Sequence, residues 1–246
     1  MRNRLAVALL WGAAGHATLA GLFWWLINVP ESNVWMLGLS AALVLLILFL
    51  AATVEVTACA WLGPASSFRD ALGLGVRGLL AFGLALVAFG ACWWLGARLD
   101  AWHAARSGEI DAWLIARFDL VEAWWVHRAI AVADFLLRAV FGVALAVAIV
   151  FAWVRGGMTR VARLSWLRAA LSRQALALTA AALVLFVALP WRAVPWRPEA
   201  LPPTWVQPAL AAARLLAIYL LAHVGWALVL VGGARASAER QSGPAS

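Results

Sequence analysis

The chain has 246 residues, of which 66% are hydrophobic and only 12% are charged, about half the charged share of an ordinary soluble domain. This composition excludes a water-soluble fold, because a domain of this size cannot bury so much apolar surface in one core, whereas lipid solvates the outer side chains of a membrane bundle. The net charge of +8 comes from arginines that separate apolar segments and form no basic tail, so we expect the lipid bilayer with its anionic headgroups, and no nucleic acid, as the partner.

Six segments of the chain are apolar enough to cross a bilayer, which takes about 20 residues of helix. We therefore expect an all-α fold, a polytopic membrane bundle of about six transmembrane helices that forms one domain over residues 1–234. Residues 235–246 are polar and are expected to form a disordered cytoplasmic tail. The first apolar run follows a short basic start, as in a signal peptide, but it continues beyond Trp24 with no small-residue cleavage site, which favours a retained helix. The expected spans cover residues 5–27, 35–62, 77–97, 129–154, 174–191 and 208–232.

The charges in the connectors predict the membrane topology of the chain. With the N-terminus inside, most of the arginines, including those of the connector at 155–173, lie in inner loops, where only Asp70 and Glu239 oppose them. Most of the acidic residues then lie outside, together with most of the 17 tryptophans, which favour the membrane interface. Because arginine is enriched on the cytoplasmic side of membranes, we expect a multi-pass protein of a bacterial-type inner membrane with both termini in the cytoplasm.

Two of the inner connectors resemble one another. Ser66–Leu72 and Leu164–Leu171 each contain a serine, an aromatic residue and an arginine, followed by small apolar residues. One explanation is a repeat of three helices plus three helices, an arrangement found in many transporters. The other is that any arginine-bearing connector has this composition, and the sequence does not decide between the two.

The segment 99–128 carries a pattern with a period of 11 residues, in which acidic residues, tryptophans and arginines each recur. Three helical turns have nearly this length, so each residue type forms a stripe along a helix, with the tryptophans about 160° from the acids. We predict one external amphipathic interfacial helix over about 109–127, preceded by a break at Ser107-Gly108. Its rings would enter the interface and its acids would face water or a partner subunit; the alternative is a loop built from residue types that are common here. The predicted interfacial and partner-docking residues are Asp100, Trp102, Arg106, Asp111, Trp113, Arg117, Glu122, Trp124 and Arg128.

Ionisable residues inside spanning helices are costly and are therefore functional candidates. A rise of about 1.5 Å per residue places His16 and His223 at a similar depth, with Glu55 slightly closer to the cytoplasm. His103 and His127 are isolated in the tryptophan-rich outer segment, where packing at the interface is the expected role. The candidates within the membrane are His16, Glu55, Asp134, Arg138, Arg214 and His223.

Three interpretations of these buried groups stay open. In the first, Glu55 pairs with His223 and Asp134 pairs with Arg214 or Arg138, which locks the bundle. In the second, Glu55 with His16 or His223 forms a proton-binding or substrate-binding site. In the third, His16 and His223 clamp a b-type haem, because bis-imidazole ligation needs two histidines at equal depth. Apart from that haem we predict no cofactor and no metal site.

The sequence contains no motif of a soluble enzyme, such as a Walker loop, a dinucleotide-binding glycine pattern, a nucleophile elbow or an HExxH zinc motif. We therefore do not expect an enzyme, and we predict a non-catalytic accessory or scaffold subunit that contacts other membrane-protein subunits. A transporter component and a haem-binding electron-transfer subunit are the alternatives. The spans lack the mid-membrane glycine and proline breaks that are common in transporters; the prolines gather instead at 190–208.

Overall fold

The computed structural model describes residues 2–30, 33–118, 124–188 and 206–238, and this part of the chain is helical with no strand, as the all-α prediction requires. Two short π-helical turns, η1 and η2, continue longer helices. The elements in chain order are α1 (Arg2–Ile27), α2 (Val34–Leu62), α3 (Phe68–Arg77), α4 (Leu79–Phe118), α5 (Trp124–Phe135), η1 (Leu136–Phe141), α6 (Gly142–Ala162), α7 (Ser165–Ala170), α8 (Arg173–Leu183), η2 (Val184–Ala188) and α10 (Val206–Ala238).

Five helical segments in the described part of the chain are long and apolar enough to cross a membrane, which makes this a multi-pass membrane protein by composition. The predicted count of about six is not confirmed. The apolar helix Arg173–Ala188, made of α8 and η2, is shorter than these five, and the remainder of the expected span at 174–191 lies outside the described residues. The five segments are Asn3–Ile27, Val34–Leu62, Leu79–Phe118, Trp124–Ala162 and Pro208–Ala236.

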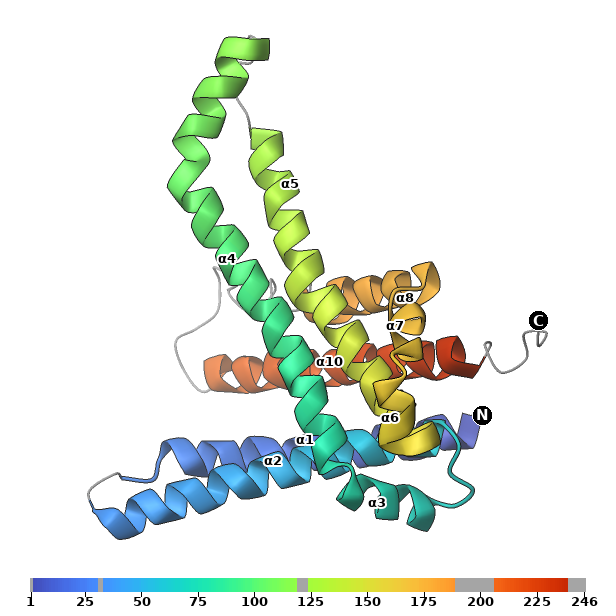
Figure 1. Cartoon of the computed structure of the whole chain (residues 1–246). Coiled ribbons are helices and arrows are strands. Elements are labelled where there is room, and N and C mark those ends of the chain that lie inside the picture. Colours follow the sequence, from blue (N-terminus) through green and yellow to red (C-terminus); the bar gives the residue numbers. More distant parts are fainter. Residues whose placement is uncertain (1, 31–32, 119–123, 189–205, 239–246) are drawn as a thin grey trace, which may run out of the picture.

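The helices form two groups that cross one another (Figure 1). Helices α1 and α2 form a hairpin, and α10 packs against both of them. Helix α4 packs along α6, and these two run at a steep angle to α1, α2 and α10 (Figure 1). The C-terminal part of α4 and the helix α5 packed against it extend beyond the rest of the bundle (Figure 1). We define the projecting hairpin as residues 98–118 and 124–135.

The projecting hairpin replaces the separate interfacial helix predicted over 109–127, which is not confirmed. Helix α4 runs without interruption through Ser107 and Gly108 to Phe118, so the predicted break there is wrong. Residues 119–123 lie outside the described part, and α5 begins at Trp124. At the other end of the chain, α10 continues to Ala238, so the first residues of the expected tail are helical, and 239–246 are not described.

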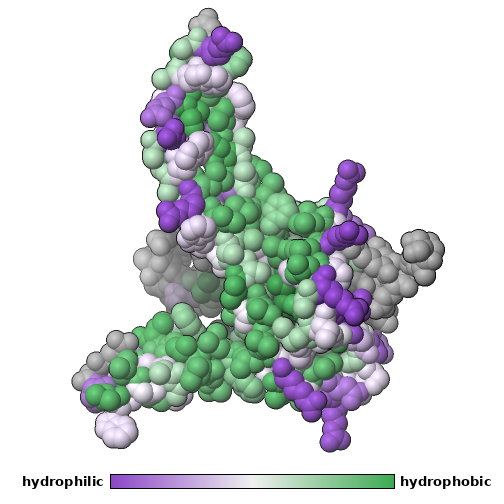
Figure 2. Space-filling view, in the orientation of Figure 1, coloured by the Kyte–Doolittle hydropathy of each residue, from purple (hydrophilic) through white to green (hydrophobic). Residues whose placement is uncertain are grey.

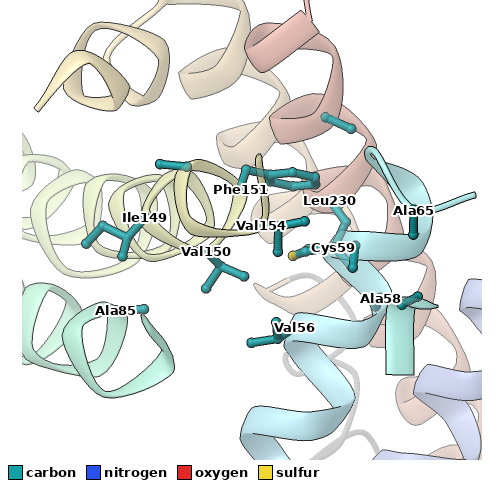
Figure 3. Packing of buried hydrophobic residues seen from close by; sticks show 14 of the residues in the cluster. Val56, Ala58, Cys59, Ala65, Ala85, Ile149, Val150, Phe151, Val154 and Leu230 are labelled. Carbon is teal, nitrogen blue, oxygen red and sulfur yellow. The ribbon is translucent and has the colours of Figure 1, made fainter. Parts of the chain in front are cut away.

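The buried core lies where α2, α6 and α10 meet (Figure 3). Phe151 of α6 is fully buried, and Leu230 of α10 is only 1% exposed. Small residues surround them, including Ala58 and Ala60 of α2, and these let the helix backbones approach closely. At Gly233 of α10 an added Cβ would lie 2.6 Å from Val147 Cγ1 of α6.

Hydrophilic side chains gather at one end of the bundle, where α3 and α7 lie, and along the projecting hairpin (Figure 2). Both of the similar connectors contain a short helix there. Ser67 caps α3 in a reciprocal capping box with Asp70, and hydrogen bonds from Ser66 and Ser67 hold the pKa of Asp70 below its usual value. We call this region the arginine-rich end, since the elements that start or finish there carry Arg4, Arg69, Arg77, Arg155, Arg160, Arg163, Arg168, Arg173 and Arg235.

Candidate functional site

Three of the predicted candidates, one from each of α1, α2 and α10, meet inside the bundle. His16 Nδ1 lies 3.1 Å from His223 Nε2, and His16 Nε2 lies 2.8 Å from Glu55 Oε1. His16 is therefore the middle member, and the direct Glu55–His223 pair of the first interpretation is replaced by a chain through His16. We call His223, His16 and Glu55 the intramembrane triad.

Two aromatic residues of α10 contact this triad, Trp226 through a hydrogen bond and Tyr219 through its ring. Trp226 Nε1 donates to Glu55 Oε2 at 2.9 Å, so both carboxylate oxygens have a partner. The Tyr219 hydroxyl donates to the Ala13 carbonyl at 2.6 Å, and its ring centroid lies 4.7 Å from that of His223. The spacing of Tyr219, His223 and Trp226 places them on one face of a helix. That spacing is visible in the sequence, but the bond from Trp226 to Glu55 was not predicted.

Glycines on α1 allow the close approach that this network needs. An added Cβ at Gly12 would lie 2.5 Å from Trp226 Cη2, and one at Gly15 would lie 2.4 Å from Val54 Cγ2. The Trp11 indole donates to the Val54 carbonyl at 3.1 Å and fixes α1 on α2 at the same level. Helix α1 is thus held against α10 and α2 at the positions that present His16.

The hydrogen-bond geometry of the triad is compatible with neutral histidines beside an ionised Glu55. With Glu55 ionised and both histidines neutral, His223 Nε2–H donates to His16 Nδ1 and His16 Nε2–H donates to Glu55, so every contact is satisfied with a net charge of −1. One added proton creates an imidazolium beside the carboxylate and brings the net charge to zero. An isolated charge is costly inside a membrane, so a positive charge beside Glu55 is favoured whether a proton or a bound cation supplies it.

A cavity of about 410 Å³ lies beside the triad, between α1, α2, α4, α6, α8, η2 and α10. This volume falls in the range of small-molecule sites, about 300–1,000 Å³. His16 and Glu55 form its polar wall, while Phe82, Phe89 and Val150 are among the apolar side chains that line the rest. Of the described residues around the cavity, Glu55 alone carries a formal charge.

The projecting hairpin holds a second chain of the same kind. His103 Nε2 lies 2.7 Å from His127 Nδ1, and His127 Nε2 lies 2.9 Å from Asp111 Oδ1. The order of histidine, histidine and carboxylate repeats that of the intramembrane triad, and the two clusters together use all four histidines of the chain. The interpretation of His103 and His127 as isolated residues is therefore wrong, because the fold of α5 back along α4 brings them together.

Arg138 joins the two sides of the projecting hairpin at its base. Its Nε donates to Asp134 Oδ1 at 2.5 Å, and its Nη2 contacts Asp100 of α4. The predicted Asp134–Arg138 alternative is thus present, with Arg138 in the π-helical turn η1. An added Cβ at Gly96 would lie 2.4 Å from Arg138 Cγ. Arg214 lies in the first half of α10 and is half-buried.

The remaining members of the 11-residue pattern face outward. Trp102, Trp113 and Trp124 are about half exposed or more. Arg106 makes an exposed contact of 3.7 Å with Glu109, and the Arg128 guanidinium lies 4.5 Å from the Trp124 ring centroid. Arg117 is exposed in the last turn of α4, and Glu122 lies outside the described residues. The acids differ, since Asp100 and Asp111 turn toward η1 and α5 of the same chain.

Comparison of the chain with protein-family models, with curated proteins and with solved structures finds no match.

Within the described ranges, no group of three or more histidine, cysteine or acidic side chains could hold a metal ion. The rings of His16 and His223 contact each other directly, with 4.9 Å between their centroids. The haem at these two residues stays a prediction that the present observations do not test.

Proposed function

We propose that this chain is a transport component that binds a lipophilic cation inside the membrane in exchange for one proton. The observation that carries the proposal is the position of His16 and Glu55, the two triad members that form the polar wall of the apolar cavity of about 410 Å³. This is the second interpretation of the buried groups, and the geometry favours it over the accessory subunit because a binding volume adjoins Glu55.

The nature of the ligand follows from the charge and the lining of the cavity. Its apolar walls suit a lipophilic molecule, and a single carboxylate suits one positive charge. A cation beside Glu55 and a proton on His16 each bring the site to zero net charge, so the two compete. Because His16 lies within hydrogen-bond distance of both His223 and Glu55, a proton can pass along the triad without a bulk water molecule in between.

The test is binding of tetraphenylphosphonium, a lipophilic cation, to the purified protein in detergent at several pH values. We expect tighter binding at high pH, and Glu55→Gln should weaken binding about tenfold or more and remove its pH dependence. The matched control is Asp111→Asn, which removes the carboxylate of the other histidine cluster and faces no part of this cavity. Equal affinity and equal pH dependence for Glu55→Gln and the unchanged protein would exclude the proposal.

A second candidate is the accessory subunit of a larger membrane complex. The projecting hairpin supports it, because Trp102, Trp113 and Trp124 leave large apolar rings exposed on a part that extends beyond the bundle. We expect stoichiometric partners in a gentle-detergent purification that are lost in a Trp113→Ala variant. A chain that purifies alone would count against this candidate. The visible spectrum of the same sample addresses haem, since a Soret band lost in His16→Ala would favour electron transfer.

We also propose that the protein lies in a bacterial-type inner membrane with its arginine-rich end on the cytoplasmic side. The gathering of arginines in the elements at one end of the bundle supports placing that end in the cytoplasm of a bacterial-type cell. The cavity would then lie between this end and the projecting hairpin.

A further inference from the structure

A second cavity lies at the arginine-rich end, between α6 and α7, with a volume of about 200 Å³. It shares no lining residue with the cavity beside the intramembrane triad. Two arginines, Arg155 and Arg160, line it together with Ser165 and Trp166, and the rest of its wall is apolar. Nothing in the proposed transport function uses these residues.

The backbone at the end of α6 is shaped to form this cavity. The helix is interrupted at Gly156 and Gly157, and Gly157 has φ of 62°, which favours glycine. An added Cβ at Gly156 would lie 3.0 Å from Arg160 Cβ, so the stem of Arg160 packs directly on the interruption. Trp166 then donates to the Val161 carbonyl at 2.8 Å, which holds α7 against α6.

The guanidinium of Arg155 has fewer hydrogen-bond partners than it has N–H donors in this position. Its Nη2 donates to the Ala234 carbonyl of α10 at 3.0 Å. Its Nη1 is buried and has no hydrogen-bond partner among the described residues. A buried N–H of a charged group without an acceptor is costly, so the guanidinium of Arg155 keeps an unmatched positive charge at the wall of this cavity.

The charge of the site is also uncompensated. Arg155 and Arg160 line the same cavity, and none of the ion pairs within the described ranges includes either residue. Two neighbouring guanidinium groups present several N–H donors that match the oxygens of a phosphate group. Basic pockets between helices at a membrane surface bind anionic headgroups by this chemistry.

We propose that the cavity lined by Arg155 and Arg160 binds the phosphodiester headgroup of an anionic phospholipid. The guanidinium groups of Arg155 and Arg160, which both line the cavity, supply the positive charge that holds the phosphate group. The apolar part of the wall, which includes Phe151 and Ala152, lies beside the glycerol and the first acyl carbons. This wall favours a lipid over free inorganic phosphate, which offers it no apolar surface.

The test uses native mass spectrometry and thermal melting of the full-length protein in detergent, with phosphatidylglycerol, phosphatidylcholine or inorganic phosphate added. We expect phosphatidylglycerol to stay bound and to raise the melting temperature, with a smaller effect of phosphatidylcholine. Arg160→Gln should weaken phosphatidylglycerol binding about tenfold. The control is Arg168→Gln, which removes an exposed arginine of α7 that does not line the cavity.

Arg160→Gln is preferred to Arg155→Gln, because Arg155 also holds α10 through Ala234 and its loss could disturb the fold. Equal lipid affinity in Arg160→Gln and Arg168→Gln would overturn the site. Stabilisation by millimolar inorganic phosphate but not by phosphatidylglycerol would overturn the proposal that the ligand is a lipid, and would indicate a soluble phosphate compound instead. Either result leaves the binding of tetraphenylphosphonium at Glu55 unaffected, so the two proposals fail separately.

Discussion

Gly12 sets the distance between α1 and α10 beside the intramembrane triad. It is buried, and the Trp226 ring occupies the place where a side chain would begin. The same ring donates a hydrogen bond to Glu55 and lies 5.3 Å, centroid to centroid, from His16. A single missing methyl group therefore controls whether the tryptophan can reach the carboxylate.

Gly12→Ala should destabilise the protein, because its Cβ would lie 2.5 Å from two ring carbons of Trp226 and the indole would have to move. We expect a loss of about 1–3 kcal/mol, the usual cost of an overpacked core, and a lower melting temperature in detergent. Gly21→Ala on the same helix is the control, since nothing lies within 4 Å of its added Cβ. Alanine has the higher helix propensity, so this control should be neutral or slightly stabilising, and equal melting of both variants would contradict the argument.

The helical elements follow closely from the sequence where the signal is local. Long apolar runs predict α1, α2 and α10 with ends that differ by only a few residues from the observed ones, because a spanning helix must satisfy its own backbone. The expected span at 174–191 is an exception, since α8 and η2 form a shorter apolar helix and the remaining residues are not described. The break predicted at Ser107-Gly108 is wrong because a lone glycine costs only about 1 kcal/mol in a helix, which a 40-residue helix tolerates.

The 11-residue pattern shows what local periodicity can and cannot predict. It predicts Asp100 and Asp111 on one face of a helix that meets water or another subunit, and in the structure both acids contact other parts of the same chain. The partner is η1 and α5 of the same chain, which the pattern cannot reveal. Whether His127 lies opposite Asp111 depends on where α4 ends and how the chain returns, and neither is encoded in the spacing of residue types. The same holds for the intramembrane triad, where depth predicted proximity but not that His16 is the middle member.

At the scale of the whole molecule, the two crossing groups of helices meet mainly through α2, α6 and α10 near the arginine-rich end. The cavity beside the triad lies between the groups, with walls from α1, α2 and α10 on one side and from α4 and α6 on the other. A change in the crossing of the two groups would therefore alter this cavity directly. The projecting hairpin is the far part of the second group, and Arg138 closes its base with contacts to both of its sides.

The absence of a side chain at Gly96 allows α4 to approach Arg138 and Asp134 closely at the base of the projecting hairpin. An added Cβ there would lie 2.4 Å from Arg138 Nε and 2.6 Å from Asp134 Oδ1, so Gly96→Ala should push the ion pair away from α4. We expect a loss of about 1–3 kcal/mol from overpacking and faster hydrogen exchange in the projecting hairpin, because Arg138 can no longer hold Asp100. Gly90→Ala is the matched control on the same helix, since its added Cβ meets nothing within 4 Å. If both variants show the same exchange in residues 98–118 and 124–135, the hairpin is not held by this joint.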